Sequence, residues 1–120
     1  MKKILIVEDD EVLREVLVYM FRSEGFETVE AENGLIGYEV FLAEHPDVIV
    51  SDVIMPKCDG VEFSRRVFSS AHPVPIAIVS GYTNNLNLND LSQSPHLIGV
   101  FEKPFDENHL IKEVKAAVKL

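Results

Sequence analysis

Short apolar runs alternate along the chain with segments in which apolar residues recur every three or four positions. A first strand is expected over residues 3–7, where apolar residues follow one another without alternation, as in a strand buried on both faces. Asp10 is suited to cap the helix that follows, and Gly25 is suited to end it. The apolar positions of this helix are Val12, Leu13, Val16, Leu17, Met20 and Phe21.

The same alternation continues to the end of the chain. Asn33-Gly34 reads as a turn between the second strand and the second helix. The further strands are expected over residues 28–31, 48–51, 76–79 and 98–101. The remaining helices have the apolar positions Ile36, Val40, Phe41, Phe63, Val67, Leu110, Ile111, Val114, Ala117 and Val118. Five β-α units predict one α/β domain over residues 1–120, a doubly wound, flavodoxin-like parallel sheet of order 2-1-3-4-5 with helices on both faces.

One segment departs from this regularity. Residues 84–96 occupy the place of the fourth helix but contain four Asn and two Ser. The side chains of Asn and Ser compete for backbone hydrogen bonds and disfavour helix interiors. We therefore expect a short or irregular fourth helix.

Composition and charge narrow the classes of partner. The 120 residues carry a net charge of −9, which would repel nucleic acid and anionic membrane surfaces. No segment approaches the ~20 apolar residues of a membrane span, and the N-terminus resembles no signal peptide. A single cysteine, Cys58, cannot form an internal disulfide, so a reducing compartment fits. These observations predict a cytoplasmic domain that binds neither nucleic acid nor membrane.

Acidic residues follow two of the predicted strands directly. Glu8 and Asp9 come after the first strand, and Asp52 comes after the third. The carboxyl ends of parallel strands form one edge of an open sheet, so these carboxylates should meet there. Carboxylates are hard oxygen ligands of the kind that Mg²⁺ prefers. Each acid alone has a plain alternative, because Glu8 and Asp9 also precede a helix and Asp52 can cap a turn; the combination favours a metal site that takes an anionic ligand.

Two further polar residues end strands at the same edge. Ser80 ends the fourth strand, where its hydroxyl can donate to a phosphoryl oxygen or simply terminate the strand. Lys103 follows the fifth strand and can bind phosphate as a point charge, whereas a lone lysine is usually only solvated. Pro104 restricts the backbone of the lysine before it to extended geometry and allows a cis bond, which favours a fixed direction for the Lys103 side chain.

Four segments together resemble the receiver domains of two-component response regulators, and the resemblance extends over essentially the whole chain. The segments are residues 4–10, 51–60, 79–81 and 101–105. The resemblance implies that Asp52 accepts a phosphoryl group from a sensor histidine kinase or a histidine phosphotransfer protein. It implies Mg²⁺ held by Glu8, Asp9, Asp52 and the backbone carbonyl of Ile54, with Ser80 and Lys103 contacting the phosphoryl group.

The resemblance also implies an output through protein contact. Phosphorylation would shift the surface formed by the fourth helix, the fifth strand (residues 98–101) and the fifth and last helix. A downstream protein target would bind according to that change. We expect a monomer or a weak, phosphorylation-dependent dimer, with self-phosphorylation and self-dephosphorylation but no turnover of a separate substrate. A single-domain regulator and a receiver separated from an output domain are both compatible with the sequence.

Two departures from the family pattern carry expectations of their own. The family usually has an aromatic residue three positions before the lysine, where this chain has Val100, and the aromatic Phe101 comes one residue later. A one-residue offset along a strand reverses the face, so the aromatic part of the switch is in question. Ile54 and Tyr82 should flank the mouth of the site, where we expect them to hinder attacking water and prolong the phosphoaspartate.

Other readings of the acidic residues remain open at this point. A metal-dependent phosphotransferase or nuclease would use acids at strand ends, but Asp-x-Asp pairs are missing: Glu11 lies two residues after Asp9 and Ile54 two residues after Asp52. A receiver-like domain that signals without phosphate would not require the full set of acids with Ser80 and Lys103. The four histidines show no metal spacing and are read as surface residues.

Overall fold

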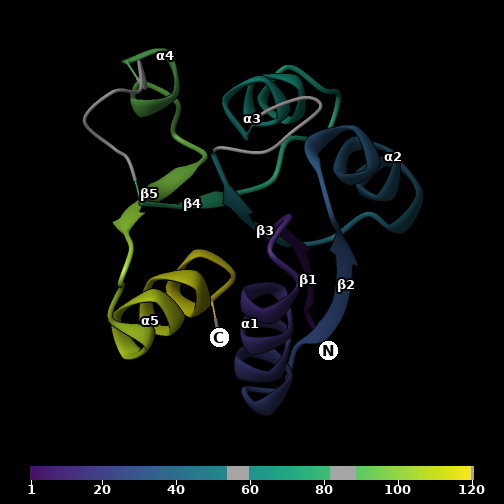
Figure 1. Cartoon of the computed structure of the whole chain (residues 1–120). Helices are drawn as coiled ribbons and strands as arrows, with labels where there is room; N and C mark the ends of the chain where they lie inside the picture. Colours follow the sequence, from purple (N-terminus) through teal and green to yellow (C-terminus); the bar gives the residue numbers. More distant parts are fainter. Residues whose placement is uncertain (54–59, 82–88, 120) are drawn as a thin grey trace.

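The computed structural model describes residues 1–53, 60–81 and 89–119 of the chain. Five strands form one parallel sheet of order β2-β1-β3-β4-β5, which confirms the predicted topology (Figure 1). Their bounds are β1 Lys3–Val7, β2 Glu27–Ala31, β3 Val48–Asp52, β4 Ile76–Ser80 and β5 Leu97–Glu102. The order reverses between β1 and β3, so the carboxyl ends of these two neighbours form the crevice that such sheets use for ligands.

Helices cover both faces of the sheet. In the described residues they are α1 Glu11–Ser23, α2 Gly34–Glu44, α3 Gly60–Phe68, α4 Asn89–Ser92 and α5 Glu107–Ala117. Figure 1 shows α1 and α5 on one face of the sheet and α2, α3 and α4 on the other. One cluster of buried side chains joins the sheet to α1 and α5, and a second joins the opposite face to α2, α3 and α4. Every residue of β3 and β4 is buried, as expected for inner strands that are covered on both faces.

Polar caps fix the helix starts close to the predicted positions. The Asp10 carboxylate accepts hydrogen bonds from the backbone N–H groups of Val12 and Leu13, which fixes the start of α1 directly after the acidic pair. Asn33 caps α2 in the same way, accepting from the N–H of Ile36 at 2.9 Å. The predicted turn at Asn33-Gly34 is therefore a helix start, because the Asn side chain supplies the acceptor that the first helical turn lacks.

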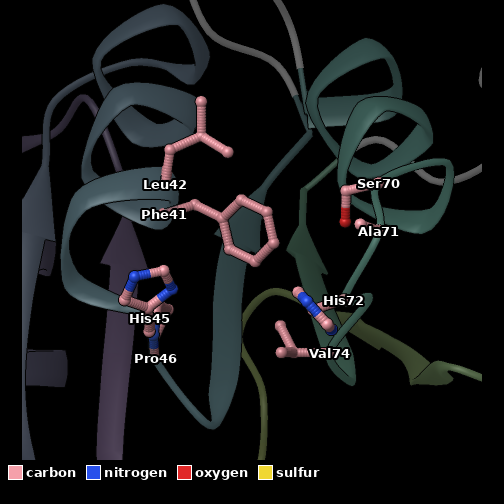
Figure 2. Close-up of a pocket in the computed structure, with 8 residues that line it drawn as sticks. All are labelled: Phe41, Leu42, His45, Pro46, Ser70, Ala71, His72 and Val74. Carbon is pink, nitrogen blue, oxygen red and sulfur yellow. The ribbon is translucent and has the colours of Figure 1, made fainter.

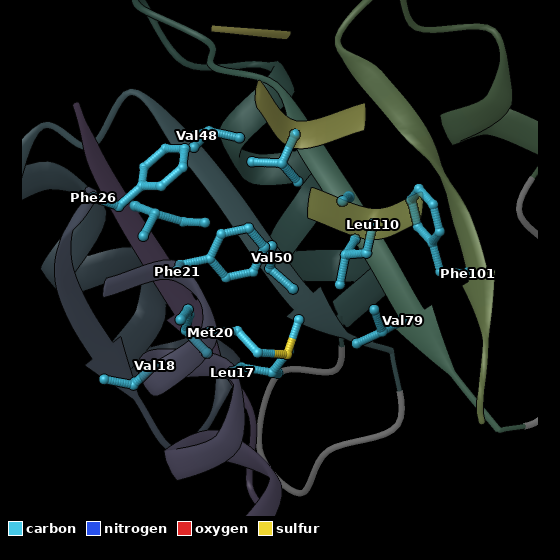
Figure 3. Close-up of a cluster of buried hydrophobic side chains, with 14 of the residues drawn as sticks. Leu17, Val18, Met20, Phe21, Phe26, Val48, Val50, Val79, Phe101 and Leu110 are labelled. Atoms are coloured by element: carbon cyan, nitrogen blue, oxygen red, sulfur yellow. The ribbon is translucent and has the colours of Figure 1, made fainter. Parts of the chain in front are cut away.

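The cluster under α1 and α5 contains three buried phenylalanines, Phe21, Phe26 and Phe101 (Figure 3). Phe21 and Phe26 meet edge to face, with ring centroids 5.6 Å apart. Phe101 points from β5 into the same cluster and lies 5.3 Å from the ring of His109 on α5. This packing holds α5 on the edge strand β5, next to Lys103.

Neighbouring residues of β5 face opposite sides of the sheet. Phe101 is 8% exposed within the α1–α5 layer, whereas Val100 is 37% exposed. Val100 is in register with Ile78, whose side chain belongs to the cluster of the α2–α4 layer. The aromatic residue is therefore on the face opposite to that of Val100, as the one-residue offset predicts.

The fourth helix is short in the part of the chain that the structure describes. Only Asn89–Ser92 are helical, and Leu91 anchors them with a side chain that is 2% exposed. Residues 84–88 of the Asn-rich segment lie outside the described residues, so the prediction for that part stays a prediction. In the described part of this segment, Leu91 is the buried apolar residue that packs against the α2–α3 side of the sheet.

Candidate metal centre

Three carboxylates meet at the carboxyl edge of the sheet. Glu8 and Asp9 follow β1, and Asp52 ends the neighbouring strand β3. Val7 and Ser51, the residues directly before Glu8 and Asp52, are partners in the β1–β3 pairing. A carboxylate oxygen from each of the three side chains lies within 4.8 Å of the other two. Glu8 and Asp52 are buried, while Asp9 is exposed. The arrangement offers three hard oxygen donors at one point, of which one faces solvent.

Lys103 places its ammonium against two of these carboxylates. Its Nζ donates to Glu8 Oε1 and to Asp52 Oδ2, each at 3.2 Å. The Lys103 backbone N–H donates to the carbonyl of Ser80 at 2.8 Å, which ties the end of β5 to the end of β4. The Lys103–Pro104 peptide bond is cis, and Ser80 is fully buried at the same edge. All the sequence-predicted site residues that the structure describes thus lie at one edge of the sheet.

The electrostatics of the cluster are unfavourable without a further cation. Burial raises the pKa of Glu8 to about 7, and the Asp52 carboxylate adds to this rise. The N–H of Asp10, which donates to Glu8 Oε2 at 3.1 Å, and the Lys103 ammonium act in the opposite direction. Burial alone would lower the pKa of Lys103, but Asp52 and Glu8 outweigh it and raise the pKa. Three carboxylates face one ammonium, so a divalent cation would stabilise the ionised cluster.

The backbone around Asp52 is held closely. Asp52 Oδ1 accepts from the N–H of Val53 at 2.7 Å, and the Ser51 hydroxyl donates to the Asp52 carbonyl at 2.8 Å. Gly60 begins α3 and donates its N–H to the carbonyl of Val53 at 2.8 Å. A Cβ at Gly60 would lie 2.0 Å from the Asp52 carbonyl oxygen, which no side chain tolerates. Glycine is required there because the start of α3 passes against the end of β3.

Sequence reasoning missed two residues that support the site. Gly60 is the last residue of the motif over residues 51–60, but its contact with Asp52 becomes visible only once β3 and α3 are placed. Arg14 lies outside the apolar repeat of α1. A polar residue at such a position is expected to face solvent, so periodicity assigns it no role in a site. In the structure its guanidinium donates to the carbonyl of Glu8 at 2.8 Å and to Glu30 Oε1 at 3.0 Å. The available signal was a basic residue near the start of the helix that follows the acidic pair.

Some predicted residues lie elsewhere or outside the described chain. Ile54, Cys58 and Tyr82 lie outside the described residues, so the predictions made for them stay predictions. His45 and His72 line an apolar groove of about 490 Å³ between the carboxyl ends of α2 and α3 (Figure 2). His45 directly follows α2 and leads into the start of β3, so this groove lies at the amino edge of the sheet. It contributes no group to the acidic cluster. Among the described residues, no helix is long and apolar enough to span a membrane.

Comparisons with known proteins agree on one family. The sequence profile of the family "Response regulator receiver domain" matches residues 4–115. The chain is 31% identical over 115 residues to the response regulator receiver protein CpdR of Brucella abortus, which covers 96% of this chain and 95% of that protein. It is 33% identical over 118 residues to sporulation initiation phosphotransferase F of Bacillus subtilis, which covers 98% of this chain and 91% of that protein.

A solved structure gives the same result at the level of the fold. The response regulator protein TrrA of Thermotoga maritima, in complex with Mg(2+)-BeF, superimposes with a TM-score of 0.85 at 29% identity. The superposition covers 98% of this chain and 99% of that chain. These likenesses confirm the resemblance that the four sequence motifs indicated.

Proposed function

We propose, because this chain belongs to the family of response regulator receiver domains, that it accepts a phosphoryl group on Asp52. The donor would be the phosphohistidine of a sensor histidine kinase or of a histidine phosphotransfer protein. One observation carries the proposal: the Asp52 carboxylate lies 3.2 Å from the Lys103 ammonium and within 4.8 Å of the Glu8 and Asp9 oxygens. A phosphoryl group arriving at Asp52 would therefore meet a fixed ammonium on one side and a cation site on the other.

The donor set fits Mg²⁺. Glu8, Asp9 and Asp52 supply carboxylate oxygens, and the buried Glu8, with a pKa near 7, is a group that a cation would ionise fully. Glu8, Asp9 and Asp52 would hold the ion, with the backbone carbonyl of Ile54 as the further ligand that the family resemblance implies. Bound Mg²⁺ neutralises charge on a transferring phosphoryl group. TrrA of Thermotoga maritima, a related chain, is solved as a complex with Mg(2+)-BeF, which supports this choice of metal.

The protein's own groups divide the reaction among them. A carboxylate oxygen of Asp52 attacks phosphorus, the new O–P bond forms as the P–N bond of the phosphohistidine breaks, and the imidazole nitrogen keeps the electron pair. The Val53 N–H, 2.7 Å from Asp52 Oδ1, fixes the orientation of the carboxylate. Lys103 pairs with the phosphoryl oxygens, and the Ser80 hydroxyl at the end of β4 donates to one of them.

The signal would leave the site through β4 and β5. The Lys103 N–H donates to the Ser80 carbonyl, so a backbone hydrogen bond links the two residues that would contact the phosphoryl group. Both residues lie next to α4 and α5. We infer that phosphorylation shifts the surface of α4, β5 and α5, which a downstream protein reads. Phe101 is packed under α5 and Val100 holds the exposed position, which supports a switch without the swing of an aromatic side chain from β5. The domain turns over no separate substrate and stays a monomer or a weak, phosphorylation-dependent dimer.

Intact mass after incubation with acetyl phosphate tests the proposal. We expect one phosphoryl adduct on the wild type with Mg²⁺ and none without the metal. The Asp52→Asn variant should show none, while the control Asp47→Asn, a carboxylate at the amino edge bound to the Lys3 N–H, should behave as the wild type. Failure of folded wild type to form an adduct would favour a receiver that signals without phosphate. Turnover of a generic phosphoester would favour a phosphotransferase instead.

A further inference from the structure

The guanidinium of Arg14 joins three elements beside the acidic cluster. Arg14 lies on α1, donates from Nη1 to the Glu8 carbonyl at 2.8 Å, and donates from Nε to Glu30 Oε1 on β2 at 3.0 Å. Its side chain is 16% exposed, whereas that of Glu30 is 49% exposed. The guanidinium is thus enclosed and held in one orientation by an acidic partner at the rim.

The carbonyl that Arg14 contacts belongs to the peptide unit between the two acids. That unit is planar, so the direction of the Glu8 carbonyl also sets the position of the Asp9 N–H and the start of the Asp9 side chain. On the other side of the same residue, the Glu8 N–H donates to the carbonyl of Ala31 at 3.0 Å. The two hydrogen bonds fix both peptide units of Glu8 where β1 has ended and no strand ladder holds the Glu8 carbonyl.

We propose that Arg14 is a positioning residue of the metal site. It fixes the Glu8–Asp9 peptide so that the buried Glu8 carboxylate and the exposed Asp9 carboxylate point to the same cation. This inference rests on the proposed function, because it concerns the Mg²⁺ that Glu8, Asp9 and Asp52 would hold. Outer groups that orient metal ligands typically change affinity 10- to 100-fold when they are removed.

The role requires a guanidinium rather than a positive charge. Two N–H groups in one rigid plane reach the Glu8 carbonyl and the Glu30 carboxylate together, whereas a lysine ammonium is a point donor on a flexible stem. The Arg14–Glu30 ion pair is partly exposed and contributes little to stability by itself. Its effect is therefore to orient the guanidinium toward the Glu8 carbonyl.

Simple electrostatics predicts the opposite sign. Arg14 is a cation close to a proposed cation site, so its removal should tighten Mg²⁺ binding if only charge matters. Loss of orientation should weaken binding instead. Arg14→Lys keeps the charge and loses the fork, so charge alone predicts no change for that variant.

Calorimetric titration with Mg²⁺ separates these readings. We expect Arg14→Lys and Arg14→Met to bind about 10-fold more weakly than the wild type or worse. The matched control is Arg22→Met, because Arg22 is on the same helix and also donates to β2, at Thr28 Oγ1, 2.9 Å away. That control should bind as the wild type does. Glu30→Gln, which leaves the guanidinium but weakens its anchor, should give an intermediate loss.

Each outcome decides a different question. Unchanged or tighter binding in Arg14→Lys and Arg14→Met would overturn the positioning role. Loss of affinity in Arg22→Met equal to that in the Arg14 variants would also overturn it, because it would reflect a general effect of the helix. A wild type that binds no Mg²⁺ would overturn the proposed function itself. If Arg14→Met fails to fold, the decision rests on Arg14→Lys, with thermal unfolding of each variant measured alongside.

Discussion

The buried carboxyl of Glu8 makes the metal-free protein less stable as pH rises. In the folded protein the pKa of Glu8 is raised from its ordinary 4.5 to about 7, first by burial and then by Asp52. The folded state therefore binds more protons than the unfolded chain between these two pH values. A folded state that binds more protons than the unfolded chain loses stability as pH rises. For Glu8 this loss of unfolding free energy begins near pH 4.5 and is complete above pH 7 or so, the folded-state pKa being about 7.

The size of the effect follows from the same shift. Each pKa unit corresponds to about 1.4 kcal/mol, so ionised Glu8 lowers the free energy of unfolding by roughly 3 kcal/mol at pH 8. Glu8→Gln removes the ionisable group but keeps an oxygen that can accept from Lys103 and from the Asp10 N–H. We expect the Gln variant to exceed the wild type by about 2–3 kcal/mol at pH 8 without metal, and to match it near pH 4.5.

Urea unfolding followed by far-UV circular dichroism, in the presence of a chelator, measures this difference across the pH range. Glu39→Gln makes the same chemical change on an exposed position of α2 and serves as the control. If Glu8 holds Mg²⁺ as proposed, the added ion should stabilise the wild type far more than the Glu8→Gln variant, because it would bind the folded state through Glu8. Parallel pH profiles for the wild type and Glu8→Gln would refute the reasoning, since they would mean that Glu8 is not protonated preferentially in the folded protein.

Three further changes test other parts of the site. Gly60→Ala places a Cβ 2.0 Å from the Asp52 carbonyl oxygen, so we expect a loss of ~3 kcal/mol in urea unfolding together with weaker Mg²⁺ binding; a fully stable variant would contradict the close approach. Lys103→Gln leaves the Glu8 and Asp52 carboxylates without their ammonium, and we expect about 2 kcal/mol less stability at pH 8, largely restored by Mg²⁺. No rescue by the metal would count against a shared cation site. Ile54→Asn should shorten the lifetime of the phosphoryl adduct, measured by mass against time, if Ile54 hinders water; an equal or longer lifetime would count against that role.

The sheet and its site-forming edge were predictable because the signals there are local and repeated. Apolar runs of strand length, helical periodicity between them and the rule for β-α-β connections predict a doubly wound parallel sheet, for which 2-1-3-4-5 is the natural expectation with five strands. That order alone brings Glu8, Asp9 and Asp52 to one edge. Asp10 was recognisable as a cap for the same reason, since its partners are two and three residues away.

The supporting contacts were not predictable because they join residues that only the fold brings together. Gly60, the first residue of α3, contacts the end of β3, and Arg14 reaches both Glu8 and Glu30 across two strand ends. The pKa of Glu8 depends on burial, which sequence spacing does not measure. At Asn33 the local pattern fits either a turn or a helix cap, and packing of α2 on the sheet decides for the cap.

The identity of the phosphoryl acceptor is the central claim, and it is tested by chemical trapping of the modified side chain. The wild type is incubated with acetyl phosphate and Mg²⁺, reduced with borohydride, digested and analysed by tandem mass spectrometry. Borohydride converts an aspartyl phosphate to homoserine, so the modified position is read directly from the fragment ions. If Asp52 is the acceptor, homoserine replaces it alone, and only when both phosphodonor and Mg²⁺ are present. Homoserine in place of Asp9 or another aspartate, or at no position in folded protein, would contradict the assignment.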